Sequence, residues 1–247
     1  MIVRDDGDSF LLITQPEHAR LARDIVSAIR TEPALRGGTR DSILLATLEH
    51  DNGWQEVDSG PTIDPATGRP CDFINGPARV KHELWPRGIR RVAQVDLRAG
   101  ALIAQHALTV YSYRAGEPEW QPFFVAITAL RDDMLRQIAC FDGPPRDDFD
   151  REYRCVRLGD SFSLQFCNGW AKPQVTFGYR AELNGSSLAI SPDPFGESVV
   201  PLRVLARRIG ARRYVNDADL RAALAAVEPE WLDGCACGDV PSSGLPR

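Results

Sequence analysis

The stretch Glu49-His50-Asp51-Asn52-Gly53 decides the fold, because it sets an imidazole and a carboxylate side by side at the end of a helical segment. Residues 39–48 carry apolar side chains at helical spacing, and the Asn-Gly pair that follows is typical of a helix end. Imidazole nitrogens and carboxylate oxygens are ligands that iron, manganese and zinc accept. The stretch therefore predicts a helical domain built around a metal site.

The other candidate ligands are spread along the chain on further predicted helices. All four histidines lie between positions 18 and 106, and an aspartate follows later in the segment 158–164. Each candidate lies three or four residues from apolar side chains, so the helical repeat turns it toward the core. The predicted metal ligands are His18, His50, Asp51, His82, His106 and Asp160.

Carboxylates that face a core need a compensating positive charge, because an isolated buried carboxylate is costly. A divalent transition metal supplies that charge directly. Six ligands exceed what one tetrahedral zinc needs, so the pattern favours two ions, iron or manganese, with zinc also compatible. The competing interpretation is that any one histidine is a hydrogen-bonded core residue, and that Asp160 bonds a hydroxyl such as Ser161 or Ser163.

The rest of the pattern predicts a mainly α fold with a small C-terminal β-rich α+β appendix. Residues 1–168 are expected to form the metal-binding helical domain, opened by a hairpin over 2–14. Pro86 is expected to end a helix over 77–85, with a short helix following from 88 to 95. Residues 169–247 are expected to form strands, a final helix and a disordered tail.

Composition narrows the class of protein. The 247 residues carry a net charge of -5, which disfavours a nucleic-acid partner, because a surface that tracks phosphates is usually basic. No apolar run approaches the roughly 18 residues that span a bilayer, and no signal peptide is recognised at the N-terminus. The expectation is a cytoplasmic protein that acts on a small molecule. An exposed strand of the β-rich part would offer a surface for a homodimer.

The order His, His-Asp, His, His, Asp on successive helices resembles the HD superfamily, with His18, His50-Asp51, His82, His106 and Asp160 in the matching places. The two additional histidines resemble the dinuclear branch of that superfamily. This resemblance covers residues 16–167 and implies an HD-domain-like helical bundle with a metal-dependent activity. That branch includes cyclic-dinucleotide phosphodiesterases of the HD-GYP kind. The Gly-Tyr-Pro element of those enzymes does not follow in this sequence, which argues against hydrolysis of cyclic dinucleotides.

A second resemblance covers nearly the whole chain. The segments Leu11–Ala19, Glu49–Trp54 and Asp64–Pro70 resemble an uncharacterised bacterial family, domain of unknown function 3891. That family implies no reaction.

Three functions remain open. The first is metal-dependent hydrolysis of a phosphoester or nucleotide, with Asp51 and Lys81 as catalytic residues and a basic group holding the substrate phosphate. The candidate basic groups are Lys81, Arg79, Arg87, Arg90 and Arg91. The second is a mixed-valent di-iron oxygenase, in which Lys81 anchors a substrate oxygen. The third is a non-enzymatic metal-binding or sensor protein.

Two further sets of residues are assigned to the surroundings of the metal. Aromatic side chains are expected to wall the pocket, namely Trp54, Phe73, Trp85 and Trp120. Polar side chains near the ligands are expected to orient them, namely Glu17, Asn52, Glu56 and Asp58.

Overall fold

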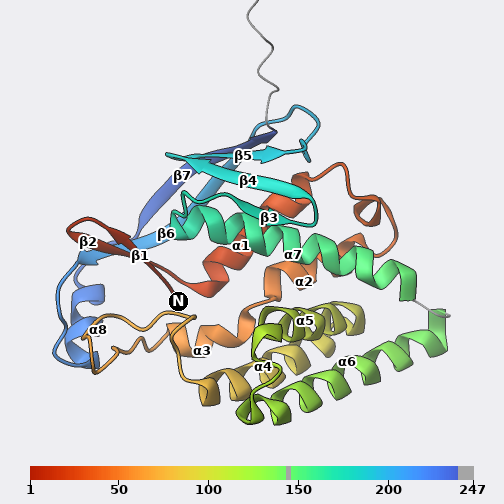
Figure 1. The fold of residues 1–247 in the computed structure, drawn as a ribbon, viewed down its shortest axis with the longest axis horizontal. Helices are drawn as coiled ribbons and strands as arrows, with labels where there is room; N and C mark the ends of the chain where they lie inside the picture. The colour runs from red at the N-terminus through yellow and green to blue at the C-terminus, as the bar shows by residue number, and fades with distance from the viewer. Residues whose placement is uncertain (143–145, 239–247) are drawn as a thin grey trace, which may run out of the picture.

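The computed structural model describes residues 1–142 and 146–238 (Figure 1). The described α-helices are α1 (Gln15–Ala28), α2 (Arg40–Glu49), α3 (Gln55–Asp58), α4 (Ala78–Ala93), α5 (Leu97–Val110), α6 (Gln121–Asp142), α7 (Arg146–Asn168) and α8 (Asp217–Ala225). Short 3-10 helices are η1 (Pro33–Arg36), η2 (Asn52–Trp54), η3 (Ser112–Arg114) and η4 (Pro118–Trp120). The strands are β1 (Ile2–Asp6), β2 (Ser9–Ile13), β3 (Gln174–Thr176), β4 (Tyr179–Asn184), β5 (Ser187–Ser191), β6 (Val200–Gly210) and β7 (Glu230–Gly238). Within this part of the chain, no helix has the length and apolar character needed to cross a membrane.

All seven strands form one mixed sheet in the order β1-β2-β6-β7-β5-β4-β3. The long strand β6 connects the two parts of this sheet. Its residues 207–210 pair with β2, and its residues 200–206 pair with β7. β5 and β7 run parallel, and the other neighbours run antiparallel. The N-terminal hairpin therefore belongs to the same sheet as the strands that follow α7.

The predicted mainly α fold with a small β-rich appendix is wrong, because a seven-stranded sheet makes the architecture α+β. Local periodicity found the hairpin, but it carries no signal for pairing between residues about two hundred positions apart. The strand β7 was missed because Gly234, Gly238 and two cysteines give it a poor strand pattern. Gly234 is needed there, since a Cβ would lie 2.3 Å from the carbonyl oxygen of Ser186. The tail expected to be disordered, residues 239–247, lies outside the described residues.

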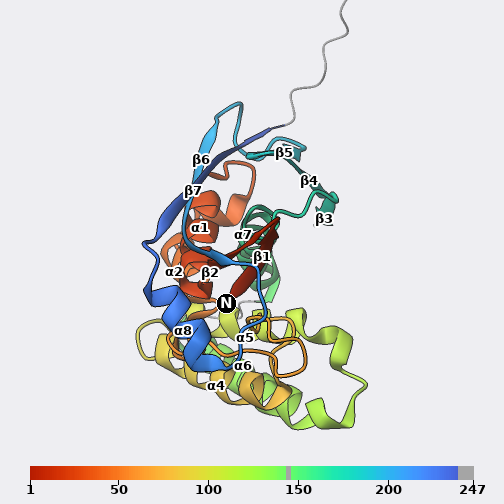
Figure 2. The ribbon, with the colours of Figure 1, turned by 90° about the vertical axis from the view of Figure 1, so that its left-hand side faces the viewer.

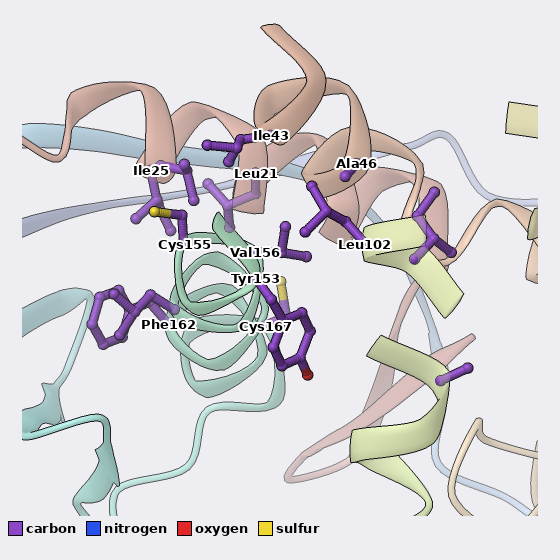
Figure 3. Close-up of a cluster of buried hydrophobic side chains, with 14 of the residues drawn as sticks. Leu21, Ile25, Ile43, Ala46, Leu102, Tyr153, Cys155, Val156, Phe162 and Cys167 are labelled. Carbon is purple, nitrogen blue, oxygen red and sulfur yellow. The ribbon is translucent and has the colours of Figure 1, made fainter. Parts of the chain in front are cut away.

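The helices stack in layers beneath the sheet (Figures 1 and 2). α1 and α7 lie next to the sheet, α2 and α5 pack against them, and α4 and α6 cover α5 on the far side. In Figure 3, buried apolar side chains from α1, α2 and α5 gather around α7. Leu21, Ile43, Leu102 and Val156 in this cluster are each no more than 1% exposed. The core thus places α7 at the centre of the helical layer.

Side-chain caps mark the starts of α1 and α5, whereas the helix end expected at Pro86 is not found in α4. The hydroxyl of Thr14 accepts the Glu17 N–H at the start of α1, and Asp96 caps α5 in the same way. α4 continues through Pro86, where two separate helices were expected. Proline removes one backbone hydrogen bond. The buried face of α4, which includes Trp85 and Ile89, offsets that loss by packing against α5.

Gly159 allows α7 to approach α1 and α2 closely. A Cβ at this position would lie 2.5 Å from Val26 Cγ2 and 3.0 Å from the carbonyl oxygen of Ala22. It would also lie 3.0 Å from Thr47 Cγ2 of α2. Because Gly159 precedes Asp160, this contact sets how near that carboxylate comes to the other two helices.

We expect the substitution Gly159→Ala to lower the free energy of unfolding by about 1–3 kcal/mol, since the added methyl group overpacks a helix crossing. Urea unfolding followed by circular dichroism measures this change. The matched control is Gly116→Ala, because a Cβ at Gly116 meets nothing within 4 Å. Equal stability of the two variants would contradict the close helix contact.

Candidate metal centre

Four helices deliver five of the predicted ligands to one place. His18 comes from α1, His106 from α5 and Asp160 from α7, while His50 and Asp51 follow the last residue of α2. All five side chains are buried. They form two overlapping groups, His18 with His50 and Asp51, and His50 with His106 and Asp160, in which the donor atoms lie within 4.8 Å of one another.

The turn after α2 is held against α4. The side-chain amide of Asn52 donates to the carbonyl oxygens of Glu49 at 2.8 Å and Gly88 at 3.3 Å. Gly53 brings the turn close to α4, since a Cβ there would lie 2.6 Å from the Leu84 carbonyl oxygen. The Asn-Gly pair therefore fixes the direction in which the preceding histidine and aspartate leave the helix.

The separations among four donor atoms suit one metal ion. His18 Nε2 lies 3.2 Å from His50 Nε2, 3.2 Å from Asp160 Oδ1 and 3.9 Å from Asp51 Oδ2. His50 Nε2 lies 3.5 Å from each of those two oxygens. Ligands bound at about 2.0–2.1 Å to a tetrahedral ion lie about 3.3 Å from one another. The two histidine nitrogens are therefore spaced from each other and from both carboxylate oxygens approximately as ligands of one ion are.

Hydrogen bonds on the far side of two rings orient their nitrogens. His50 Nδ1–H donates to the Thr47 carbonyl oxygen at 2.7 Å. The Ser163 hydroxyl donates to the Gly159 carbonyl oxygen at 2.7 Å, so its oxygen accepts from His18 Nδ1 at 3.0 Å. With Nδ1 protonated in both rings, each Nε2 presents a lone pair to the other. Two facing lone pairs in a buried site repel unless a proton on one nitrogen or a metal ion lies between them, so the arrangement is compatible with a metal ion.

The charges in the cluster favour a cation at its centre. Burial lowers the pKa of His50, but Asp51 and Asp160 outweigh it and raise this pKa to about 9. Burial also raises the pKa of Asp160, but Arg157 holds that pKa well below its usual value. Burial raises the pKa of Asp51 and lowers that of His106. Without a metal ion, a proton on His50 supplies the positive charge that the two carboxylates require.

A cavity of about 470 Å³ gives access to the cluster. Asp51, His106 and Asp160 line it. Its other walls are aromatic, apolar, hydroxyl and basic side chains, namely Trp54, Phe73, Ile74, Lys81, Trp85, Thr109, Val110, Tyr111, Ser112, Tyr113, Arg157 and Leu164. A cavity of this kind is typical of small-molecule sites.

His82 does not join the ligands. Its ring centroid lies 4.6 Å from that of Trp120 and 5.3 Å from that of Phe123, and its buried Nε2 has no hydrogen-bond partner. Burial lowers its pKa. Among the described residues, the groups able to hold a metal do not include it. Lys81 and Trp85 carry the face of α4 that lines the cavity, whereas His82 lies on a different face, which packs against η4 and α6.

Of the predicted aromatic walls, Trp54, Phe73 and Trp85 line the cavity, and Trp120 is buried against His82 instead. Of the predicted basic groups, only Lys81 lines it. Three of the arginines pair with glutamates outside it: Arg87 and Arg91 with Glu56, and Arg79 with Glu83. Arg90 lies on α4 beside a separate shallow pocket.

Of the residues expected to orient the ligands, Asn52 holds the turn that bears two of them. Glu17 accepts the N–H of Leu205, Glu56 pairs with arginines, and Asp58 accepts the N–H of Gln15. The sequence singled out neither Arg157 nor Tyr111, and it offered Ser163 only as a partner of Asp160, not of His18. Ser163 and Arg157 each lie three residues from Asp160, and that helical spacing was a usable signal.

Comparison with known proteins identifies one family. A family model described as "Protein of unknown function (DUF3891)" matches residues 1–210. No curated protein and no solved structure matches the chain. The resemblance to that family is confirmed, and the function has to be argued from the site.

We expect His50→Ala and Asp51→Ala each to abolish metal loading, because each removes one of four closely spaced donor atoms. Elemental analysis of protein purified with manganese, iron and zinc present measures the stoichiometry. His82→Ala is the matched control and retains the wild-type metal content, since its ring packs against Trp120. Loss of metal from the control, or full loading of His50→Ala, would refute this assignment.

The substitution Ser163→Ala removes the acceptor for His18 Nδ1–H. We expect metal affinity to fall by about 10–100-fold, the usual cost of losing a group that orients a ligating histidine. Competition with a chelating dye measures the affinity. Ser161→Ala is the control on the same helix, because the Ser161 hydroxyl bonds Thr176 instead. Unchanged affinity in Ser163→Ala would show that this hydroxyl does not orient the ring.

Proposed function

The chain belongs to the DUF3891 family of proteins of unknown function, and we propose that it is a metal-dependent hydrolase of the HD type that acts on a phosphoester. The observation that carries the proposal is that two overlapping groups of three possible metal ligands lie beside a cavity that a lysine and an arginine also line. A hydrolase needs both parts: ligands for an ion and basic groups for an anionic substrate.

His18, His50, Asp51 and Asp160 are the residues we assign to hold the ion. These side chains would hold a divalent ion, which would supply Lewis-acid chemistry: a lower pKa for a bound water molecule and polarisation of a phosphoryl oxygen. His106 forms the second group of possible ligands with His50 and Asp160, and its Nε2 lies 3.8 Å from Asp160 Oδ2. We assign one ion to His18, His50, Asp51 and Asp160, whose donor atoms lie around the two facing histidine nitrogens, and we place His106 in the wall of the cavity.

Lys81 and Asp51 are the side chains we assign to the reaction. Lys81 is buried, and its ammonium group donates to the Ile74 carbonyl oxygen at 2.7 Å. An anionic oxygen of the substrate is a stronger acceptor than this carbonyl, so Lys81 turns toward the substrate when one is bound. Asp51 Oδ2 faces the histidines, which leaves Oδ1 to accept a proton from the attacking water.

The alternative of a mixed-valent di-iron oxygenase has less support. It requires a second ion, and His82, the additional ligand expected for that ion, packs against Trp120. A purely structural metal site also has less support, because a structural site is normally closed and this one lines a cavity. Hydrolysis therefore agrees best with the arrangement of these side chains.

Assays with phosphomonoesters, phosphodiesters and nucleotides test the proposal. We expect hydrolysis that requires manganese or ferrous iron, stops on chelation and returns when the metal is restored. Lys81→Met is expected to lower the rate by about 100-fold, the usual effect of removing one donor to a developing negative charge. The exposed Lys172 gives the control variant Lys172→Met, which keeps the wild-type rate. Metal-loaded protein that consumes dioxygen and hydrolyses no ester would refute the hydrolase and support the oxygenase.

A further inference from the structure

The charged side chains that line the cavity are balanced before a metal ion binds. Asp51 and Asp160 are the acidic ones, and Lys81 and Arg157 are the basic ones. Among these four side chains, neither sign of charge is in excess.

A divalent ion changes this balance, because it neutralises the two carboxylates that bind it. Lys81 and Arg157 are then left with two positive charges and no acidic partner among the cavity-lining residues. Lys81 is 4% exposed and the Arg157 side chain is 30% exposed, so solvent screens these charges less than it screens surface charges. A ligand with two negative charges restores neutrality.

We propose that the ion-loaded cavity binds a dianion, and that the substrate of the hydrolase is a phosphate monoester. This inference rests on the proposed function and narrows its substrate class. A phosphate diester carries one negative charge and leaves one cation uncompensated, whereas a nucleoside triphosphate brings more charge than the cavity can balance. A phosphate monoester matches the two cations.

Arg157 is the residue that this inference adds to the site. It lies one helical turn before Asp160 on α7 and forms an ion pair with Asp160 Oδ2. Within the described part of the chain, that carboxylate is its one hydrogen-bonded partner. When Asp160 donates charge to a metal ion, this ion pair weakens, and the guanidinium group turns to an anion in the cavity. Its planar donors suit two oxygens of one phosphate group.

The other residues that line the cavity indicate which kind of organic group the ester carries. Trp54, Phe73, Trp85 and Tyr111 give the cavity flat apolar surfaces, which favour an aromatic or similarly flat group. A volume of about 470 Å³ lies toward the small end of the range for sites of drug-sized ligands. The cavity therefore suits a small phosphate monoester with a flat apolar group.

Calorimetric titration of the full-length protein with phenylphosphonate tests the dianion site without requiring turnover. At a pH where this ligand is a dianion, we expect manganese-loaded protein to bind it about tenfold or more tightly than metal-free protein. Arg157→Met and Lys81→Met are each expected to weaken binding by about tenfold or more. Arg87→Met is the control, because Arg87 lies on the same helix as Lys81 but pairs with Glu56.

The singly charged monomethyl ester of phenylphosphonate is the matched control ligand, and we expect it to bind about tenfold or more weakly. Equal binding of the two ligands would overturn the inference, as would unchanged binding in Lys81→Met and in an Arg157→Met variant that retains its metal. Preferential hydrolysis of bis(p-nitrophenyl) phosphate over p-nitrophenyl phosphate would overturn the inference and leave the hydrolase standing. Metal-dependent binding of phenylphosphonate without hydrolysis of any ester would support the dianion site and refute the hydrolase.

Discussion

Two imidazole nitrogens that face each other across 3.2 Å in a buried site set the central constraint of this structure. Each ring is held in place by a hydrogen bond to its other nitrogen, so neither His18 nor His50 can turn away to relieve the repulsion. The carboxylates of Asp51 and Asp160 at the same point add negative charge. Only a positive charge at the centre makes this arrangement stable, and the packing of α1, α2 and α7 keeps the four groups together.

The sheet takes part in placing these ligands, although none of them lies on a strand. β2 ends at Ile13, Thr14 caps α1, and His18 follows within the first turn of that helix. β2 is itself held by β6, so a strand near the end of the chain fixes where the first ligand lies. The family match ends at residue 210, which is also the last residue of β6. The matched segment thus contains the ligands and the strand that positions the helix bearing the first of them.

Sequence reasoning succeeded where the cause is local and failed where it is distant. Helical spacing and the Asn52-Gly53 turn were enough to bring five candidate ligands together, because side-chain direction along a helix follows from its repeat. The same reasoning placed His82 with them, since the pattern of one helix does not show which of its faces packs against η4 and α6. The sheet was underestimated because pairing between β2 and β6 leaves no mark on either segment alone. Ser163 was considered only as a partner of Asp160 on its own helix, because its contact with His18 depends on the packing of another helix.

Metal binding and anion binding are linked through Asp160. One of its carboxylate oxygens faces the histidine nitrogens, and the other pairs with Arg157. An ion bound to the first oxygen draws negative charge away from the second oxygen. The ion pair between Asp160 and Arg157 therefore weakens, and the guanidinium group becomes available to an anionic ligand. Because both events involve one carboxylate, a bound ion raises the affinity for the anion. A bound anion raises the affinity for the ion by the same factor.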